Sequence, residues 1–167
     1  MRNMAIPPSI QAFWSAFAST IGEDPSERFY EASYFGDSAA LADELAALVV
    51  AGRKRATAGL LWAYEAEGKR LPKPGNLSAV TLFAGKPVCV IETSSIQIVP
   101  FFQVDADFAA TEGEGDGSLA YWQRAHTAFF GRECERLGRE FTPNAPVVCE
   151  RFALVYRDPS AKPPSAG

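Results

Sequence analysis

The chain has 167 residues, of which 47% are hydrophobic and 22% are charged, as in an average soluble domain. These values exclude a peptide, a repeat array and a disordered chain. Sixteen lysines and arginines against twenty aspartates and glutamates give a net charge of -4, which excludes a protein that coats nucleic acid through an overall basic surface.

Two helices are predicted in the first third of the chain. Ser9 can cap the first helix, which ends at Gly22 and whose apolar residues recur at intervals of three and four. These apolar residues are Ile10, Phe13, Trp14, Phe17 and Ile21. Asp37 or Ser38 can cap the second helix, and Gly52 stands where a left-handed residue would end it.

Strands are predicted in the middle and at the end of the chain, where β-forming residues occur in short runs broken by proline and glycine. The clearest pair spans residues 79–83 and 88–99, which the short turn at 84–86 joins. A final strand is predicted at 147–156.

A third helix is predicted after the acidic, glycine-rich stretch 105–117, because Asp116 or Ser118 can cap it and Gly138 can end it. This order of elements indicates an α+β domain around a mainly antiparallel sheet or small β-barrel, flanked by about three helices. We expect one domain over residues 9–156, a loose N-terminus at 1–8 and a flexible C-terminal tail at 157–167.

The cysteines and the N-terminus predict a cytoplasmic protein. Cys89, Cys134 and Cys149 form no CxxC pair and the chain has one histidine, so a structural zinc site is not expected. Neither a continuous apolar leader nor a run of about 20 apolar residues occurs. We therefore expect reduced thiols and no membrane association.

The sharpest local pattern is the run Gly52-Arg53-Lys54-Arg55-Ala56-Thr57 at the exit of the second helix. Lys54 stands between two arginines, and their like charge favours loss of its proton. Such a lysine could act as a base, and Thr57 could be a nucleophile or could hold a substrate oxygen. The alternative is a solvated basic helix exit followed by a threonine in a strand.

The stretch 112–117 places Glu112, Glu114 and Asp116 two residues apart on a glycine-rich loop. The pattern is similar to the opening of a calcium loop, but the twelfth position is Gln123 instead of a glutamate. A glutamate here could be a general acid or base if the fold brings it near Lys54. A solvated acidic turn before a helix is the alternative.

Two aromatic residues close behind the basic run could stack nucleic-acid bases. Trp62 and Tyr64 would share one face if their segment were extended, and single strands are held by aromatic rings beside cations. Packing into the core is the alternative interpretation. His126 falls on the apolar side of the third helix, where a buried and satisfied histidine is expected rather than a catalytic one.

Four segments in combination resemble the longer bacterial branch of the ASCH family, in the PUA-like superfamily. They are AGRKRATAGLLWAYE at 51–65, CVIETSSIQIVPF at 89–101, DFAATEGEGDGSLAYWQRAHTAFF at 107–130 and PVVCERFALVY at 146–156. The resemblance implies a PUA-like β-barrel flanked by helices, with a cleft beside a GxKxxT motif formed by Gly52, Lys54 and Thr57.

The resemblance also implies a function linked to RNA. One longer-branch member is described as a ribonuclease for single-stranded RNA, and a short bacterial member removes the acetyl group of N4-acetylcytidine with a lysine, a threonine and a glutamate. Lys54 and Thr57 match the first two roles. Glu112 is the closest match to the glutamate and Glu114 is the second.

We therefore expect an RNA-binding hydrolase that acts on single-stranded RNA, with a nucleoside amidohydrolase of the N4-acetylcytidine type or a non-catalytic RNA or modified-nucleotide reader as alternatives. The expected catalytic residues are Lys54, Thr57 and Glu112. The expected substrate-binding residues are Arg53, Arg55, Trp62, Tyr64, Glu114 and Ser118. The sequence requires no cofactor and contains no clear metal ligands, although a divalent metal and a homodimer are both compatible with it.

Overall fold

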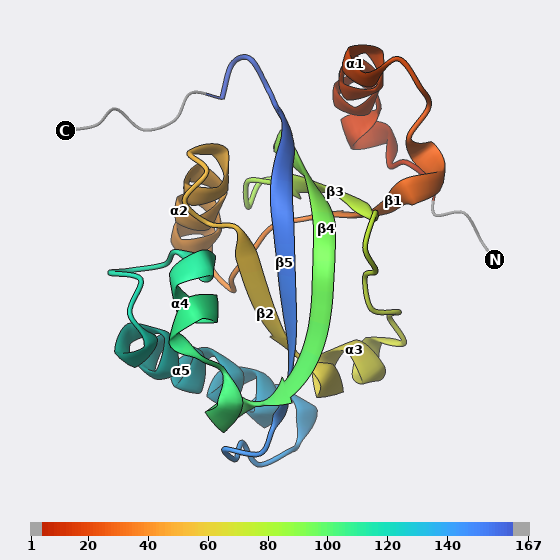
Figure 1. The fold of residues 1–167 in the computed structure, drawn as a ribbon. Helices are drawn as coiled ribbons and strands as arrows, with labels where there is room; N and C mark the ends of the chain where they lie inside the picture. The colour runs from red at the N-terminus through yellow and green to blue at the C-terminus, as the bar shows by residue number, and fades with distance from the viewer. Residues whose placement is uncertain (1–4, 162–167) are drawn as a thin grey trace.

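The computed structural model describes residues 5–161, so expectations for 1–4 and 162–167 lie outside the described residues. It confirms an α+β domain built on a five-stranded sheet (Figure 1). The strands are β1 (Phe29–Ser33), β2 (Ala56–Leu60), β3 (Leu77–Thr81), β4 (Pro87–Pro100) and β5 (Pro146–Arg157).

The strands lie in the order β1-β3-β4-β5-β2. Every neighbouring pair is antiparallel except β1 with β3, so the sheet is mainly antiparallel as expected. Strands β1 and β2 form its two edges, and the sheet is not closed into the barrel that was expected. The long strands β4 and β5 run side by side through the whole molecule and connect its upper and lower parts (Figure 1).

Within residues 5–161, five α-helices surround this sheet, against about three expected. They are α1 (Gln11–Ile21), α2 (Ala39–Val50), α3 (Leu61–Glu67), α4 (Ala106–Glu112) and α5 (Leu119–Leu137). The caps of α2 and α5 are confirmed: the hydroxyl of Ser38 accepts a hydrogen bond from the backbone of Leu41, and that of Ser118 from the backbone of Tyr121. The expected Ser9 cap is wrong, because a short 3₁₀ turn precedes α1 and Ile10 occupies its N-cap.

The two helices that sequence patterns missed are short. Helix α3 occupies the segment assumed to be extended, so Trp62 and Tyr64 do not share a strand face. Helix α4 begins at Asp105, whose carboxylate accepts a hydrogen bond from the backbone of Phe108, and ends at the left-handed Gly113. Seven residues are too few to show a clear apolar period, and both helices depend on their packing.

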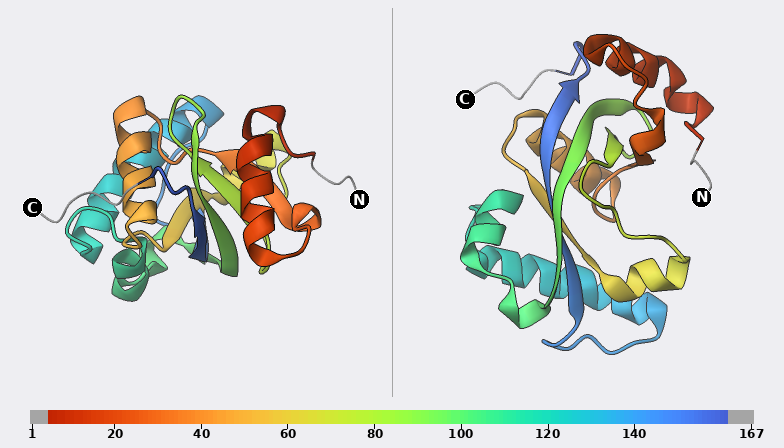
Figure 2. Two further views of the ribbon diagram at one scale, coloured as in Figure 1. Left: turned by 90° about the horizontal axis from the view of Figure 1, so that it is seen from above. Right: turned by 45° about the vertical axis from the view of Figure 1, so that its right-hand side comes forward.

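The sheet has apolar residues on both faces. Helix α1 packs through Trp14 and Phe17 on the face that contains Val90, whereas α2 packs through Val49 on the face that contains Cys89 and Ile91. Figure 2 shows α1 and α2 on opposite sides of β4 and β5. A third apolar cluster holds α4 and α5 against β2 and the first half of β5. This apolar cluster holds together the elements that carry the candidate functional site.

Residues 5–161 contain no helix that is both long and apolar enough to cross a membrane. Cys89, Cys134 and Cys149 are buried and free. Strand β5 continues through Arg157, the first residue of the expected tail and one residue beyond the expected end of the strand.

Candidate functional site

The basic run places its three side chains on two sides of the chain. The segment 53–55 is extended between α2 and β2, and successive side chains of an extended segment point in opposite directions. Arg53 and Arg55 are therefore exposed, while Lys54 is only 1% exposed. The arginines do not surround the lysine, and its electrostatic environment is set by other residues.

The Lys54 ammonium lies against two carboxylates. Its Nζ donates a hydrogen bond of 2.7 Å to the backbone oxygen of Ala56 and one of 3.3 Å to Oε2 of Glu112. Oε2 of Glu114 lies 3.8 Å away, and the ring centroid of Phe35 lies 5.0 Å away. Glu112 is 2% exposed, so the ion pair is buried, and a buried charge requires such a partner.

The close approach of two chain segments creates this pairing. Gly113 has φ +69°, and a Cβ added there would lie 2.1 Å from the backbone oxygen of Arg53. Beside it, the amide of Arg55 donates a 2.9 Å hydrogen bond to the backbone oxygen of Thr111. Only glycine allows the end of α4 to lie directly on the basic run, and this contact places Glu112 and Glu114 beside Lys54.

Glu112 is held in place from several directions. The indole Nε1 of Trp122 donates a 2.7 Å hydrogen bond to Oε1, and Nε2 of His126 lies 3.3 Å from Oε2. Burial by itself would raise the pKa of Glu112, but the charge of Lys54 and hydrogen bonds from Glu114 and His126 bring the pKa well below its ordinary value. Glu112 is therefore the ionised member of the carboxylate pair.

Glu114 is the protonated member of this pair. Burial raises its pKa to about 8, and the hydrogen bond to Glu112 and the charge of Glu112 add to this effect against the opposing charge of Lys54. Its Oε2 is buried and accepts no hydrogen bond from any residue in 5–161. Two adjacent carboxyl groups whose pKa values are driven apart in this way are typical of acid–base sites.

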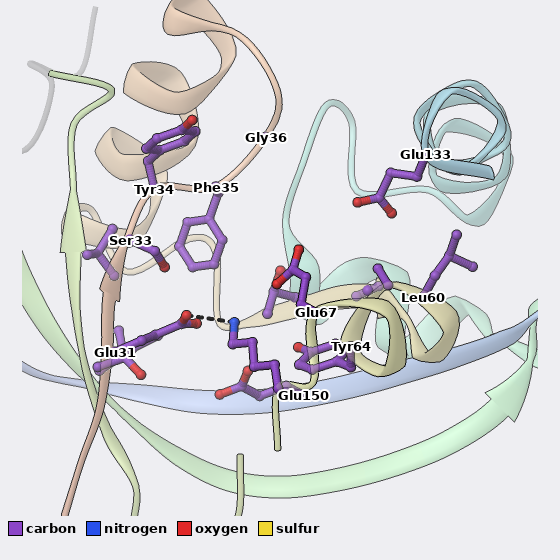
Figure 3. Close-up of a pocket in the computed structure, with 18 of the residues that line it drawn as sticks. Glu31, Ser33, Tyr34, Phe35, Gly36, Leu60, Tyr64, Glu67, Glu133 and Glu150 are labelled. Carbon is purple, nitrogen blue, oxygen red and sulfur yellow. Dashed lines mark ion pairs between the residues drawn. The ribbon is translucent and has the colours of Figure 1, made fainter. Parts of the chain in front are cut away.

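The cluster opens into a cavity of about 230 Å³ between α2 and α5. Lys54, Thr57, Glu112, Glu114 and His126 all line it, together with apolar side chains that include Leu41, Leu45 and Phe129. Thr57 and Ala58 also line a second cavity of about 390 Å³, on the side toward β1 and α3 (Figure 3). Thr57 thus stands where the two cavities meet.

Among the described residues 5–161, Glu112, Glu114 and His126 could hold a divalent metal, since one ligand atom from each lies within 4.8 Å of the others. The Lys54 ammonium, however, lies 3.3 Å and 3.8 Å from the same carboxylate oxygens. A dication there would be repelled by it at short range. The donor set therefore fits a metal poorly while Lys54 keeps its charge.

The structure brings together four of the residues singled out from the sequence: Lys54, Thr57, Glu112 and Glu114. Tyr64 lies in the wall of the larger cavity. The others lie elsewhere: Arg53 and Arg55 border a separate surface hollow, Trp62 packs under the guanidinium of Arg139, and the Ser118 hydroxyl is used as a helix cap.

His126 is the site residue that sequence reasoning missed. It is buried and satisfied as expected, since Nδ1 lies 2.9 Å from the backbone oxygen of Trp122, but its other nitrogen reaches Glu112. The available signal was spacing: Trp122 and His126 are one helical turn apart and stack with ring centroids 4.1 Å apart, so both reach the same carboxylate.

Comparison with known proteins finds a matching family model and solved structures that are similar to this chain. The family model described as the ASCH domain matches residues 31–156. The solved ASCH domain from Lactobacillus crispatus JV V101 is 38% identical and matches over 94% of this chain and 100% of its own, with a TM-score of 0.85. A protein from Enterococcus faecalis V583 is 31% identical over 89% of each chain, with a TM-score of 0.79. No match was found among curated proteins.

Proposed function

The chain belongs to the ASCH domain family, a PUA-like fold associated with RNA binding, and we propose that it is a hydrolase that cleaves the amide bond of an acylated nucleoside. The observation that carries this proposal is the buried Lys54 between an ionised and a protonated carboxyl group, in a cavity that Thr57 also lines. Base, acid and nucleophile are the three parts that amide hydrolysis needs.

The reactive form has a proton on Glu114 and none on Lys54. The raised pKa of Glu114 keeps its proton in place, and Lys54 reaches this form when its ammonium loses one proton to solvent. Each turnover leaves an ammonium on Lys54 and a carboxylate on Glu114, and transfer of one proton from Lys54 to Glu114 restores the reactive form without changing the total charge of the pair. Glu112 is the positioning residue, because its fixed negative charge holds Lys54 and its oxygens are already engaged by Trp122 and His126.

In the first step, the Lys54 amine accepts the hydroxyl proton of Thr57 while Oγ1 of Thr57 forms a bond to the amide carbonyl carbon. Glu114 then donates its proton to the amide nitrogen as the C–N bond breaks, which releases the nucleoside amine and leaves an ester on Thr57. A water molecule hydrolyses this ester, its hydroxyl joining the acyl group and its proton returning to Thr57. The sum is amide plus water to carboxylic acid plus amine.

The charges around Thr57 favour a small substrate over an RNA strand. Four glutamates and one lysine line the larger cavity: Glu31, Glu67, Glu133, Glu150 and Lys69. A phosphate would meet net negative charge there, whereas an uncharged nucleoside would not. This charge pattern favours the amidohydrolase alternative over the ribonuclease that the sequence resemblance put first.

The test incubates the protein separately with N4-acetylcytidine and with single-stranded RNA, and follows cytidine release and loss of full-length RNA. We expect cytidine release from the wild type and none from Thr57→Val, which keeps the side-chain shape at a half-buried position but removes the hydroxyl. Lys86→Met is the control, because Lys86 is exposed in the β3–β4 turn and should leave the rate unchanged.

Two outcomes would overturn the proposal. RNA loss without cytidine release would assign the site to RNA cleavage, the alternative that the fold's association with RNA supports. Full cytidine release by Thr57→Val would remove Thr57 as the nucleophile. Mass spectrometry of the protein during turnover gives an independent check, since an acyl group on Thr57 is expected and would be absent if water attacked directly.

A further inference from the structure

The larger cavity has a chemical character that the proposed hydrolysis does not use. Its volume is about 390 Å³, and its walls combine aromatic rings with carboxylates from four different elements (Figure 3). Glu31 comes from β1, Glu67 from α3, Glu133 from α5 and Glu150 from β5. Residues this far apart in the chain meet only because the fold assembles them.

Lys69 shows how this cavity holds an ammonium group. Its Nζ lies 2.6 Å from Oε2 of Glu31, the ion pair marked in Figure 3. The same nitrogen lies 5.2 Å from the ring centroid of Tyr64 and 5.3 Å from that of Tyr30. A carboxylate combined with aromatic faces is the environment that binds organic cations in proteins.

Within residues 5–161, Lys69 forms an ion pair with Glu31 and with none of the other three carboxylates. Glu150 is 8% exposed and accepts a 2.6 Å hydrogen bond from the Thr93 hydroxyl on one oxygen, Oε2. In Figure 3 the Glu133 side chain reaches from α5 toward the cavity, and its Oε2 is buried with no hydrogen-bond partner in residues 5–161. An unpaired buried carboxylate oxygen is costly, and a cation in the cavity would remove that cost.

We propose that this cavity binds an organic cation of the alkyldiamine class, with one ammonium group at Glu133, the other at Glu150 and the alkyl part against Tyr64 and Phe129. The cavity is large enough for an alkyl chain, and its aromatic walls provide the apolar contact that such a chain requires. The inference rests on the cavity and its charges, and it does not depend on the proposed hydrolysis. Because Thr57 lines both cavities, an amine bound here would lie beside the hydrolytic site.

The test measures binding of putrescine, an alkyl diamine, to the full chain by isothermal titration calorimetry, with butanediol as the matched probe in which hydroxyls replace both ammonium groups. We expect putrescine to bind and butanediol not to bind. Glu133→Gln and Glu150→Gln should each weaken putrescine binding by about tenfold, the change equivalent to about 1.4 kcal/mol. Glutamine in place of Glu150 can still accept the Thr93 hydrogen bond, so the fold should persist.

The control is Glu135→Gln, which removes a glutamate from the exposed side of α5 and should bind putrescine like the wild type. Absence of putrescine binding, equal binding of butanediol, or equal weakening by Glu135→Gln would each overturn the inference. Glu114→Gln separates the two proposals, since Glu114 lines only the smaller cavity, and this variant should abolish hydrolysis and retain putrescine binding.

Discussion

Replacing Lys54 by Met should destabilise the fold by leaving the buried Glu112 carboxylate without its principal counter-charge. Methionine retains most of the apolar stem, so the loss comes mainly from the ammonium group. That group donates hydrogen bonds of 2.7 Å to Ala56 and 3.3 Å to Glu112, both at positions closed to solvent. Removing one partner of such a buried pair costs about 3–5 kcal/mol of unfolding free energy.

The unfolding free energy that Lys54→Met loses should depend on pH. In the wild type Lys54 lowers the pKa of Glu112; without it, burial raises that pKa above the ordinary value of 4.5. A carboxyl group whose pKa is higher in the folded state than in the unfolded state stabilises the protein at pH values below its unfolded-state pKa. This contribution is lost as pH rises through the folded-state pKa. The deficit of Lys54→Met should therefore be largest near neutral pH and should shrink as pH falls toward 4.5.

Urea unfolding of the wild type, Lys54→Met, Glu112→Gln and the double variant measures this effect. We expect the double variant to lose about 1–3 kcal/mol less than the sum of the two single losses, because glutamine removes the unpaired charge. Additive losses, or a Lys54→Met protein as stable as the wild type at neutral pH, would refute the buried ion pair as the feature that holds the site together.

Three further outcomes are expected from the same geometry. Hydrolysis of N4-acetylcytidine should fall as pH rises through about 8, because Glu114 loses its proton there. Glu114→Gln should show no hydrolysis at any pH. A wild-type rate that does not change with pH would contradict the acid role of Glu114. In urea unfolding, Gly113→Ala should lower the unfolding free energy far more than Gly117→Ala does. Both glycines have positive φ, but only Gly113 has no room for a Cβ. Equal losses of unfolding free energy would show that the contact between Gly113 and Arg53 is not tight. Trp122→Phe should lower the unfolding free energy by about 1.5–3 kcal/mol through its lost hydrogen bond to Glu112, and a loss that is the same in a Glu112→Gln background would contradict that assignment.

The long amphipathic elements were predictable because each carries a local signal. Ser38 and Ser118 cap helices whose apolar residues repeat over several turns, and the paired strands β3 and β4 are runs of β-forming residues joined by a glycine-containing turn. The short helices α3 and α4 carry no such signal, so Trp62 and Tyr64 were assigned the wrong geometry. Closure of the sheet into a barrel could not be predicted from the sequence, because it depends on whether the edge strands β1 and β2 pair with each other.

The site was predictable in its residue types and not in its electrostatics. Lys54 and Thr57 belong to one short motif, and Glu112 could be placed beside them through the family resemblance. The neighbours in sequence predict that Arg53 and Arg55 act on Lys54, whereas the extended backbone turns both arginines outward. The one-turn spacing of Trp122 and His126 places their rings together, but the role of His126 also depends on a contact between α4 and α5, which the sequence does not identify.

The most direct measurement is the initial rate of cytidine release from N4-acetylcytidine by the wild type, Lys54→Met and Lys86→Met under identical conditions at neutral pH, with folding of each confirmed by circular dichroism. If the buried lysine and its two carboxyl groups form an amide-hydrolysing site, the wild type and Lys86→Met release cytidine at the same rate and Lys54→Met releases none. A folded Lys54→Met protein that keeps the wild-type rate, or a wild type that releases no cytidine, would contradict that conclusion.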